Sequence, residues 1–328
     1  MLSVRALAAA ILCLPAICGA AIAAEQPKSG GILRMYHRDS PGSASIHEGA
    51  TYSLNVPFMP IFNNLVLYDQ HIAQNSLDDI RPELAESWSW SDDKKKLTFK
   101  LRQGVKWHDG KPFTSADVKC TFDMLMGKSQ QKFRQNPRKS WYEQVEDVTT
   151  NGDFEASFNL KRPQPSLLAL LASGYTPIYP CHVSPAEMRT HPIGTGPFKF
   201  VEFKANESIK LTKNTDYWKK GLPYLDGIEY TIITNRSTAI LAFVAGKFDI
   251  TFPTHITIPL LKDVKSQAPS AVCVTAPTNV STNIIVNSSS PPFDNIDIRH
   301  ALALSLDRKA FIQILFEGQA DAGGTMEP

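Results

Sequence analysis

The chain has 328 residues, of which 43% are hydrophobic and 20% are charged, so it is long enough for two globular domains. Lysine and arginine outnumber aspartate and glutamate by 34 to 32, which gives a net charge of +2. This balance excludes a strong electrostatic attraction to nucleic acid or to an anionic membrane surface, and we expect neither as a partner.

Residues 1–24 have the pattern of a secretory signal peptide. Arg5 precedes an apolar stretch that runs to Ile17, and Ala21-Ile22-Ala23 offers the small-residue pattern of a cleavage site. The alternative of a membrane anchor is disfavoured because the stretch is short. Cys18 leaves a lipoprotein open, although Ile17 is a poor residue to precede a lipidated cysteine. We therefore expect export to the periplasm.

The first strand of the mature chain is predicted from the alternation of Leu33, Met35 and His37. A serine-rich turn follows at 39–45, and then a helix that begins near Tyr52. Ligands of open α/β sheets bind beyond the carboxyl ends of strands, so we expect ligand contacts between residues 38 and 52. The candidates are Arg38, Ser43, His47, Glu48 and Tyr52.

Residues 81–118 carry the most local information. Alternating residues at 97–101 and 105–107 predict a pair of strands, with a turn at Asp109-Gly110. Thr114 and Asp117 form a capping-box pattern, which predicts a helix that starts near Ser115 and ends at Gly127. Because its apolar positions are periodic, we expect this segment, including Trp107, to be scaffold rather than binding site.

Further strands and helices follow along the chain. A strand is predicted at 154–160, and the two glycines and proline at 194–197 mark a domain boundary before a strand at 198–203. From 228 to 250 the pattern is strand, helix, strand. Asp297 and Asp307 are predicted to cap two successive helices.

The run PELAESW…TFKLRQGVKWHDGKPFTSADV within residues 81–118 resembles the signature segment of the extracytoplasmic solute-binding proteins of ABC importers, in the peptide, nickel and opine family (family 5). Four later segments resemble the same family in the same order: Gly194–Phe198, Asn214–Ile228, Ala245–Ile250 and Pro291–Lys309. The resemblance covers the chain from about residue 30 to its last residue.

The resemblance implies a mixed α/β, bilobed fold of the periplasmic-binding-protein type II kind. Domain I would be discontinuous, formed by residues 25–65 and 193–280, with domain II inserted at 66–192. Residues 281–328 would begin domain III, in a second lobe that is incomplete, so we expect a C-terminally truncated chain. The crossover at 278–282 runs beside the ligand in this family, which adds two candidate contacts, Asn279 and Ser281.

The function implied by the resemblance is binding without chemistry. The protein would bind oligopeptides or dipeptides as a monomer and deliver them to the transmembrane subunits of an ABC permease, with an opine, a sugar or a nickel chelate as alternative ligands. The sequence contains no G-x-S-x-G, Walker, H-E-x-x-H or C-x-x-C motif, and its eight histidines lack metal-site spacing. We expect no cofactor and no metal; a secreted hydrolase and an interaction module are the rival hypotheses.

Two smaller expectations concern cysteine and arginine. Cys120, Cys181 and Cys273 remain after leader removal, and we interpret Cys120 and Cys273 as small core residues rather than disulfide partners. Arg134 and Arg138, four apart on a possible helix, are interpreted as a solvated basic face, with the grip of an anionic ligand as the alternative.

Overall fold

The computed structural model describes residues 27–275 and 284–322. The predicted signal peptide and the crossover at 278–282, with its candidates Asn279 and Ser281, lie outside the described residues.

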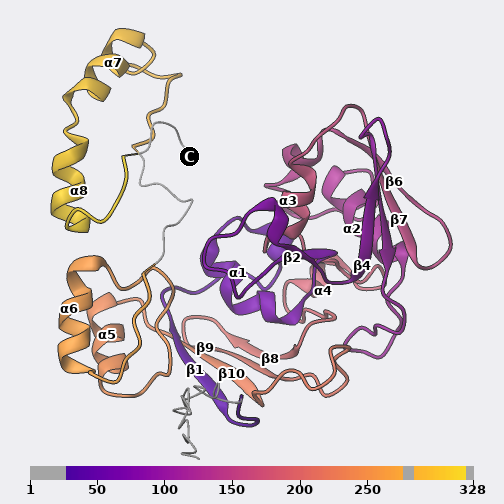
Figure 1. Cartoon of the computed structure of the whole chain (residues 1–328), viewed down its shortest axis with the longest axis horizontal. Coiled ribbons are helices and arrows are strands. Elements are labelled where there is room, and N and C mark those ends of the chain that lie inside the picture. Colours follow the sequence, from indigo (N-terminus) through magenta and orange to yellow (C-terminus); the bar gives the residue numbers. More distant parts are fainter. Residues whose placement is uncertain (1–26, 276–283, 323–328) are drawn as a thin grey trace, which may run out of the picture.

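The first sheet combines the beginning of the chain with segments from its second half (Figure 1). Its strand order is β1-β10-β9-β8, with bounds β1 (Ile32–His37), β8 (Phe198–Lys204), β9 (Ser208–Lys213) and β10 (Gly227–Ile232). β1 runs parallel to β10, and the other pairs are antiparallel. The chain thus leaves this sheet after His37 and returns at Phe198.

The intervening segment forms two further sheets. Strands β2 (Val66–Tyr68) and β3 (Ile80–Pro82) pair with each other. A four-stranded antiparallel sheet has the order β4-β5-β7-β6, with bounds β4 (Ala85–Trp90), β5 (Lys96–Leu101), β6 (Val145–Thr150) and β7 (Glu155–Leu160). Helix α2 (Ser115–Met126) packs on β6 and β7. The mixed α/β class is therefore confirmed, whereas the domain boundaries stay predictions.

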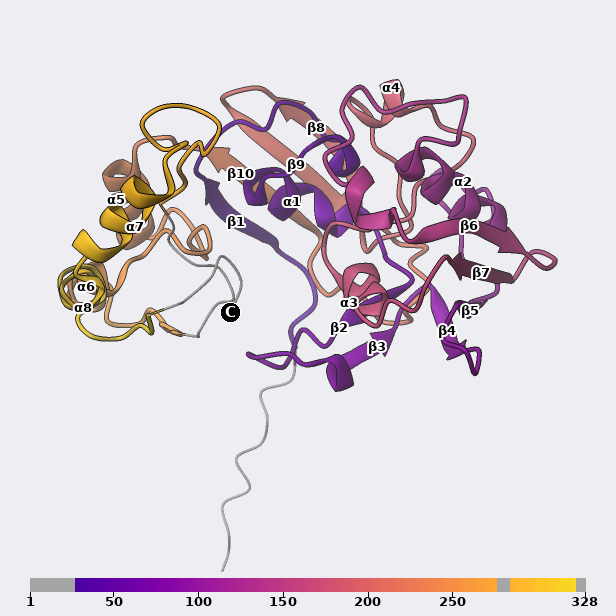
Figure 2. The same ribbon diagram turned by 90° about the horizontal axis from the view of Figure 1, so that it is seen from above.

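Seven further helices occur in the described residues. They are α1 (Tyr52–Phe58), α3 (Leu167–Ala172), α4 (Pro185–Met188), α5 (Arg236–Val244), α6 (Ile258–Gln267), α7 (Ile296–Ser305) and α8 (Arg308–Phe316). Single 3₁₀ turns occur at Ile46–Glu48, Met59–Ile61, Leu77–Asp79 and Lys139–Tyr142. Figure 2 shows that α5 to α8 gather at one end of the molecule, beyond β1. None of the described helices is both long and apolar enough to cross a membrane.

One continuous apolar core joins the sheets of the first 230 residues. Within it, Phe158 of β7 makes edge-to-face contacts with Phe99 of β5 at 5.7 Å and with Phe122 of α2 at 4.6 Å, measured between ring centroids. These geometries are favourable for aromatic rings. The apolar positions that predicted a half-buried strand at 97–101 and the helix from 115 are those that meet in this core.

The capping of α2 is confirmed in detail. Thr114 and Asp117 form a reciprocal capping box, and Gly127 ends the helix in the left-handed region, with φ +76°. The predicted strand at 105–107 is wrong, since β5 pairs with β4 and β7 instead. Residues 105–112 form a tight loop held by the hydrogen bond from Trp107 N to Lys111 O, and only Lys106 and Pro112 form an isolated β-bridge.

Three other expectations need correction. Cys120 and Cys181 form a disulfide, because α2 and the loop at 181 bring their Cα atoms to 5.7 Å despite 61 residues of separation. Cys273 is half-buried in a segment without regular structure, not in a strand. The cap of α7 is Asn295, and Asp297 lies in the first turn, whereas Asp307 caps α8 as predicted.

Candidate ligand-binding site

Arg38 directly follows the last residue of β1, and its charged side chain extends from the core toward the surface. Tyr36 and His37 are buried, and Arg38 follows them with 41% of its side chain exposed. Its Nε donates to Ser53 Oγ at 2.9 Å, and its guanidinium lies 5.2 Å above the ring of Phe252. The hydrogen bond and the cation–π contact together fix the orientation of the guanidinium.

Tyr52 lies beside Arg38 at the first residue of α1. The helix starts there because Thr51 caps it, with its hydroxyl oxygen accepting from Leu54 N at 3.2 Å. The Tyr52 side chain is 43% exposed, and its ring meets Phe252 edge-on at 5.9 Å. Ser43 is half-buried in the preceding loop, where its Oγ accepts from Ser45 N at 3.3 Å.

His47, another predicted contact, is fully buried. Its Nε2–H donates to Pro177 O at 2.7 Å, and its ring packs against Tyr179 at 4.4 Å. Burial, aided by the nearby Arg138 charge, lowers the pKa of His47 to about 3, so the imidazole is neutral. The neutral ring is enclosed by aromatic side chains and supports the loop.

Glu48 is also enclosed by the scaffold. Its Oε1 accepts from Arg189 Nη1 at 2.9 Å and from the backbone N of Arg134. The expected basic face is wrong as well, because Arg138 is buried and donates to the carbonyls of Ile46 and Gly49 at 2.9 and 2.5 Å. Two arginines distant in sequence thus clamp the 46–49 turn, a role that no local pattern revealed.

The sequence reasoning missed the turn at 252–255. His255 Nδ1 lies 3.2 Å from the hydroxyl of Tyr36, and Arg236 donates to the His255 carbonyl. Burial, followed by the charges of Arg236 and Arg38, lowers the pKa of His255. We call the group the β1-end cluster; it consists of Tyr36, Arg38, Tyr52, Arg236, Phe252 and His255.

A signal for this turn was present in the sequence. The pattern strand, helix, strand at 228–250 predicts a parallel crossover, and the structure contains a parallel bridge between Met35 and Ile250. Parallel strands end at the same edge of a sheet, so the residues after Ile250 had to lie near the end of β1. Applying this rule would have predicted that Phe252 and His255 lie near Arg38.

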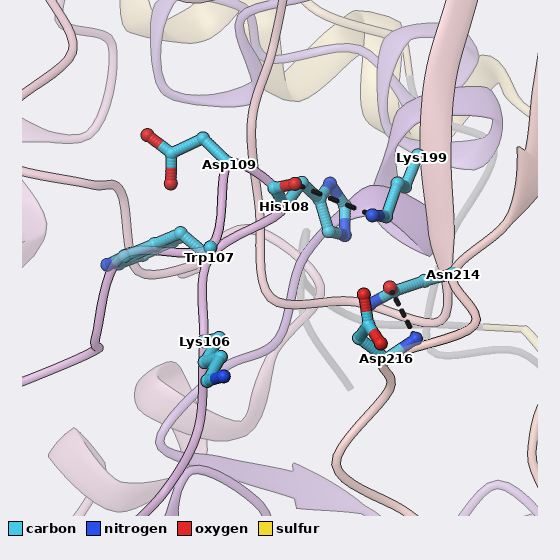
Figure 3. Close-up of a pocket in the computed structure, with 8 residues that line it drawn as sticks. Lys106, Trp107, His108, Asp109, Lys199, Asn214 and Asp216 are labelled. Atoms are coloured by element: carbon cyan, nitrogen blue, oxygen red, sulfur yellow. Dashed lines mark hydrogen bonds between the residues drawn. The ribbon is translucent and has the colours of Figure 1, made fainter.

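A separate pocket of about 260 Å³ lies between the 106–110 loop and the first sheet (Figure 3). Its lining consists of Lys106, Trp107, His108, Asp109, Gly110, Lys199, Asn214 and Asp216. Most of its polar groups are bonded within the protein. His108 Nε2–H donates to Gly196 O at 3.0 Å, as does Asn214 Nδ2, and Lys199 Nζ donates to His108 O at 3.4 Å.

This pocket is a structural junction. Burial lowers the pKa of His108 to about 4, so its imidazole serves as a neutral donor to the Gly196 carbonyl. Gly196 itself approaches Ile61 so closely that an added Cβ would lie 2.4 Å from the Ile61 carbonyl carbon. The two glycines of the 194–197 turn therefore permit its close approach to the 3₁₀ turn Met59–Ile61. Within the described residues, no three His, Cys, Asp or Glu side chains are grouped as metal ligands.

Comparison with known proteins identifies the family. The family model described as bacterial extracellular solute-binding proteins, family 5 middle, matches residues 79–328. The heme-binding protein A of Haemophilus influenzae is 30% identical over 298 residues, which are 84% of this chain and 52% of that protein. The glutathione-binding protein GsiB of Pectobacterium atrosepticum is 29% identical over 245 residues, covering 72% of this chain and 45% of its own length.

A solved structure shows the same fold. The oligopeptide-binding protein AppA from Bacillus subtilis, in complex with a nonapeptide, matches with a TM-score of 0.73 and 26% identity. The match covers 91% of this chain and 58% of the AppA chain. This likeness confirms the predicted periplasmic-binding-protein fold, and the chain spans about half the length of the curated relatives it matches. The chain belongs to the bacterial extracellular solute-binding proteins, family 5.

Proposed function

We propose that the protein binds an extracytoplasmic solute, with peptides as the leading class, and delivers it to the permease of an ABC importer. The observation that carries this proposal is the family membership of the chain across residues 79–328. The peptide class is supported by the oligopeptide- and glutathione-binding relatives, and the heme-binding relative shows that the family scaffold also accepts other ligands. Pocket chemistry, rather than the scaffold, decides between them.

The β1-end cluster is the part of the described surface that we propose for ligand contact. Arg38 and Tyr52 are exposed there, and Ser43 lies in the adjoining loop. Of the earlier candidates, His47 and Glu48 are assigned to the scaffold, since both are buried and bonded to it. Asn279 and Ser281 remain proposed contacts from the family resemblance.

The proposed activity involves no chemical change of the ligand. The protein would act as an exported monomer whose lobes close on the solute and then dock on the permease. The hydrolase hypothesis requires a nucleophile and a base that converge on a substrate. A binding protein should instead release the same molecule that it took up.

Native mass spectrometry of protein purified from the bacterial periplasm tests this function. We expect a small solute to be retained and to be released unchanged on unfolding, and adding it back should raise the melting temperature by mass action. A strain without the gene should take up that solute more slowly. Accumulation of a cleaved product in the presence of catalytic amounts of protein would favour the hydrolase instead.

A further inference from the structure

Two guanidinium groups lie at the carboxyl end of β1 with little negative charge to balance them. Among the described residues, Arg38 has a single carboxylate neighbour, Asp39, at 3.9 Å from its Nε. Arg236 forms no ion pair with any residue of the described ranges 27–275 and 284–322. Both arginines act on the imidazole of His255. The β1-end cluster is thus a site of net positive charge.

Arg38 is held so that only part of its guanidinium is engaged. Nε donates to Ser53 Oγ, a buried side chain, and one face of the group lies on the ring of Phe252, which is fully buried. The Nη1 and Nη2 atoms have no hydrogen-bond acceptor among the described residues. These two nitrogens form the edge of a guanidinium that pairs with a carboxylate through two parallel hydrogen bonds.

The surroundings of this edge are aromatic. Tyr52 stands beside Phe252 with its ring half-exposed, so an apolar part of a ligand can pack on it while a charged group reaches Arg38. The 252–255 turn holds Phe252 in place, and it does so with Thr254 at φ +65°, an unfavourable conformation for a β-branched residue. Strain of this kind is concentrated at functional sites.

We propose that the β1-end cluster binds a carboxylate of the ligand, with Arg38 as the bidentate donor and with Tyr52 and Phe252 packing against the adjoining apolar part. The inference rests on the proposed function and narrows it to acidic solutes, including peptides that present a free carboxylate at this position. The lone pairs of the carboxylate replace water at the free edge of Arg38, and the Arg236 charge adds attraction at longer range.

A matched pair of small probes tests this proposal on the whole chain. Benzoate and benzamide have the same ring but differ in charge, and their binding can be followed through the Nε resonance of Arg38 in NMR titrations. We expect benzoate to bind saturably at millimolar concentration and benzamide to bind at least tenfold more weakly. Arg38→Gln should weaken benzoate binding by about 10- to 100-fold, the range for a lost charge-assisted hydrogen bond, when the titration is followed by backbone amides.

Arg34→Gln is the matched control, since Arg34 lies within β1, four residues before Arg38, and its side chain is exposed. It should leave benzoate binding unchanged. Absence of saturable benzoate binding to the native chain, equal affinity for benzamide, or a preference that survives in Arg38→Gln would each overturn the proposal. If the purified protein retained a neutral solute, the carboxylate proposal would be overturned while the importer function stayed supported. If the purified protein retained no solute at all, the result would count against the importer function and not against the carboxylate proposal.

Discussion

The signature segment at 81–118 and the β1-end cluster differ in whether their polar side chains are bonded within the protein or left free. In the signature segment, Asp117 Oδ2 accepts from Thr114 N at 2.9 Å and from Trp107 Nε1 at 3.3 Å, and Oδ1 accepts from Cys181 N at 2.9 Å. Both carboxylate oxygens are engaged within the protein. At the β1-end cluster, by contrast, Arg38 keeps donors free and Tyr52 is exposed.

This difference explains why the family could be identified from the sequence while the ligand could not. Turns, caps and core positions of the signature segment depend on local geometry that a shared fold imposes. Residues of the β1-end cluster are the ones that we propose to meet the ligand, and a shared scaffold does not determine the chemistry of its binding pocket. We therefore assign stability to the signature segment and binding to the β1-end cluster, and substitutions in the two regions should have different effects.

Trp107→Ala should have the largest effect on stability. The indole is almost fully buried and packs edge-on against Phe113, with 6.0 Å between ring centroids. Its removal should lower the free energy of unfolding by about 3–5 kcal/mol, measured by denaturant titration. Trp90→Ala, at the half-buried end of β4, should cost less. If Trp107→Ala kept the native stability but lost benzoate binding, Trp107 would belong to the binding site and our assignment of stability to the signature segment would be wrong.

Loss of the Cys120–Cys181 disulfide should have the next largest effect. The bond closes a loop of about 60 residues in the unfolded chain, and such cross-links contribute about 2–4 kcal/mol. A reducing agent should lower the melting temperature of the native protein but not of the Cys120→Ser/Cys181→Ser variant. Equal melting temperatures with and without reductant, in protein shown by mass to carry the bond, would contradict this expectation.

Acid should lower the stability of the protein through His47, which lies in the 46–49 turn. The folded pKa of His47, about 3, lies below the value of about 6.5 for an unfolded histidine, so the unfolded state binds more protons as the pH falls. The stability from neutral His47 is therefore complete above pH 6.5 and decreases as the pH falls toward 3. Between pH 7 and 5 this single group should account for about 2 kcal/mol of lost stability.

Urea denaturation at several pH values measures this contribution. The difference in stability between the native protein and His47→Gln should shrink as the pH falls, because glutamine does not titrate. Parallel stability curves for the two proteins would show that His47 has the same pKa in the folded and unfolded states and would place it nearer to solvent than the structure does.

Arg38→Gln should have the smallest effect on stability. The side chain is partly exposed, and it loses one hydrogen bond to Ser53 and one cation–π contact with Phe252. We expect a change of about 1 kcal/mol in the free energy of unfolding. A loss as large as that of Trp107→Ala would make Arg38 part of the scaffold and would remove the contrast between the two regions.

The sequence allowed prediction of those features that depend on neighbours in the chain. The capping box of Thr114 and Asp117, the left-handed Gly127 and the alternation in β5 are all local, and all were found. The disulfide was missed because its cysteines meet only through the packing of α2 against a loop 61 residues away. Local sequence patterns do not show which residues far apart in the chain lie close together in the fold.

The site at the end of β1 stays a prediction, and the structure shows only which of its candidate side chains reach the surface. Ligand contact was expected at the end of β1, where Tyr52 is exposed and the Arg38 side chain is partly exposed. His47 and Glu48 have the same polar character in the sequence, but side chains from about 90 to 140 residues later enclose them. Polarity alone therefore did not distinguish a residue that faces the solvent from one that is buried with a partner.

The central claim is that the ligand binds at the β1-end cluster and that the 105–112 loop belongs to the scaffold. Hydrogen exchange tests this claim most directly, when it is measured with and without the solute that the purified protein retains. The account predicts that the ligand slows exchange in the segments 38–54 and 251–257 and leaves residues 105–112 unchanged. Protection confined to 105–112, around the pocket lined by His108 and Lys199, would contradict it.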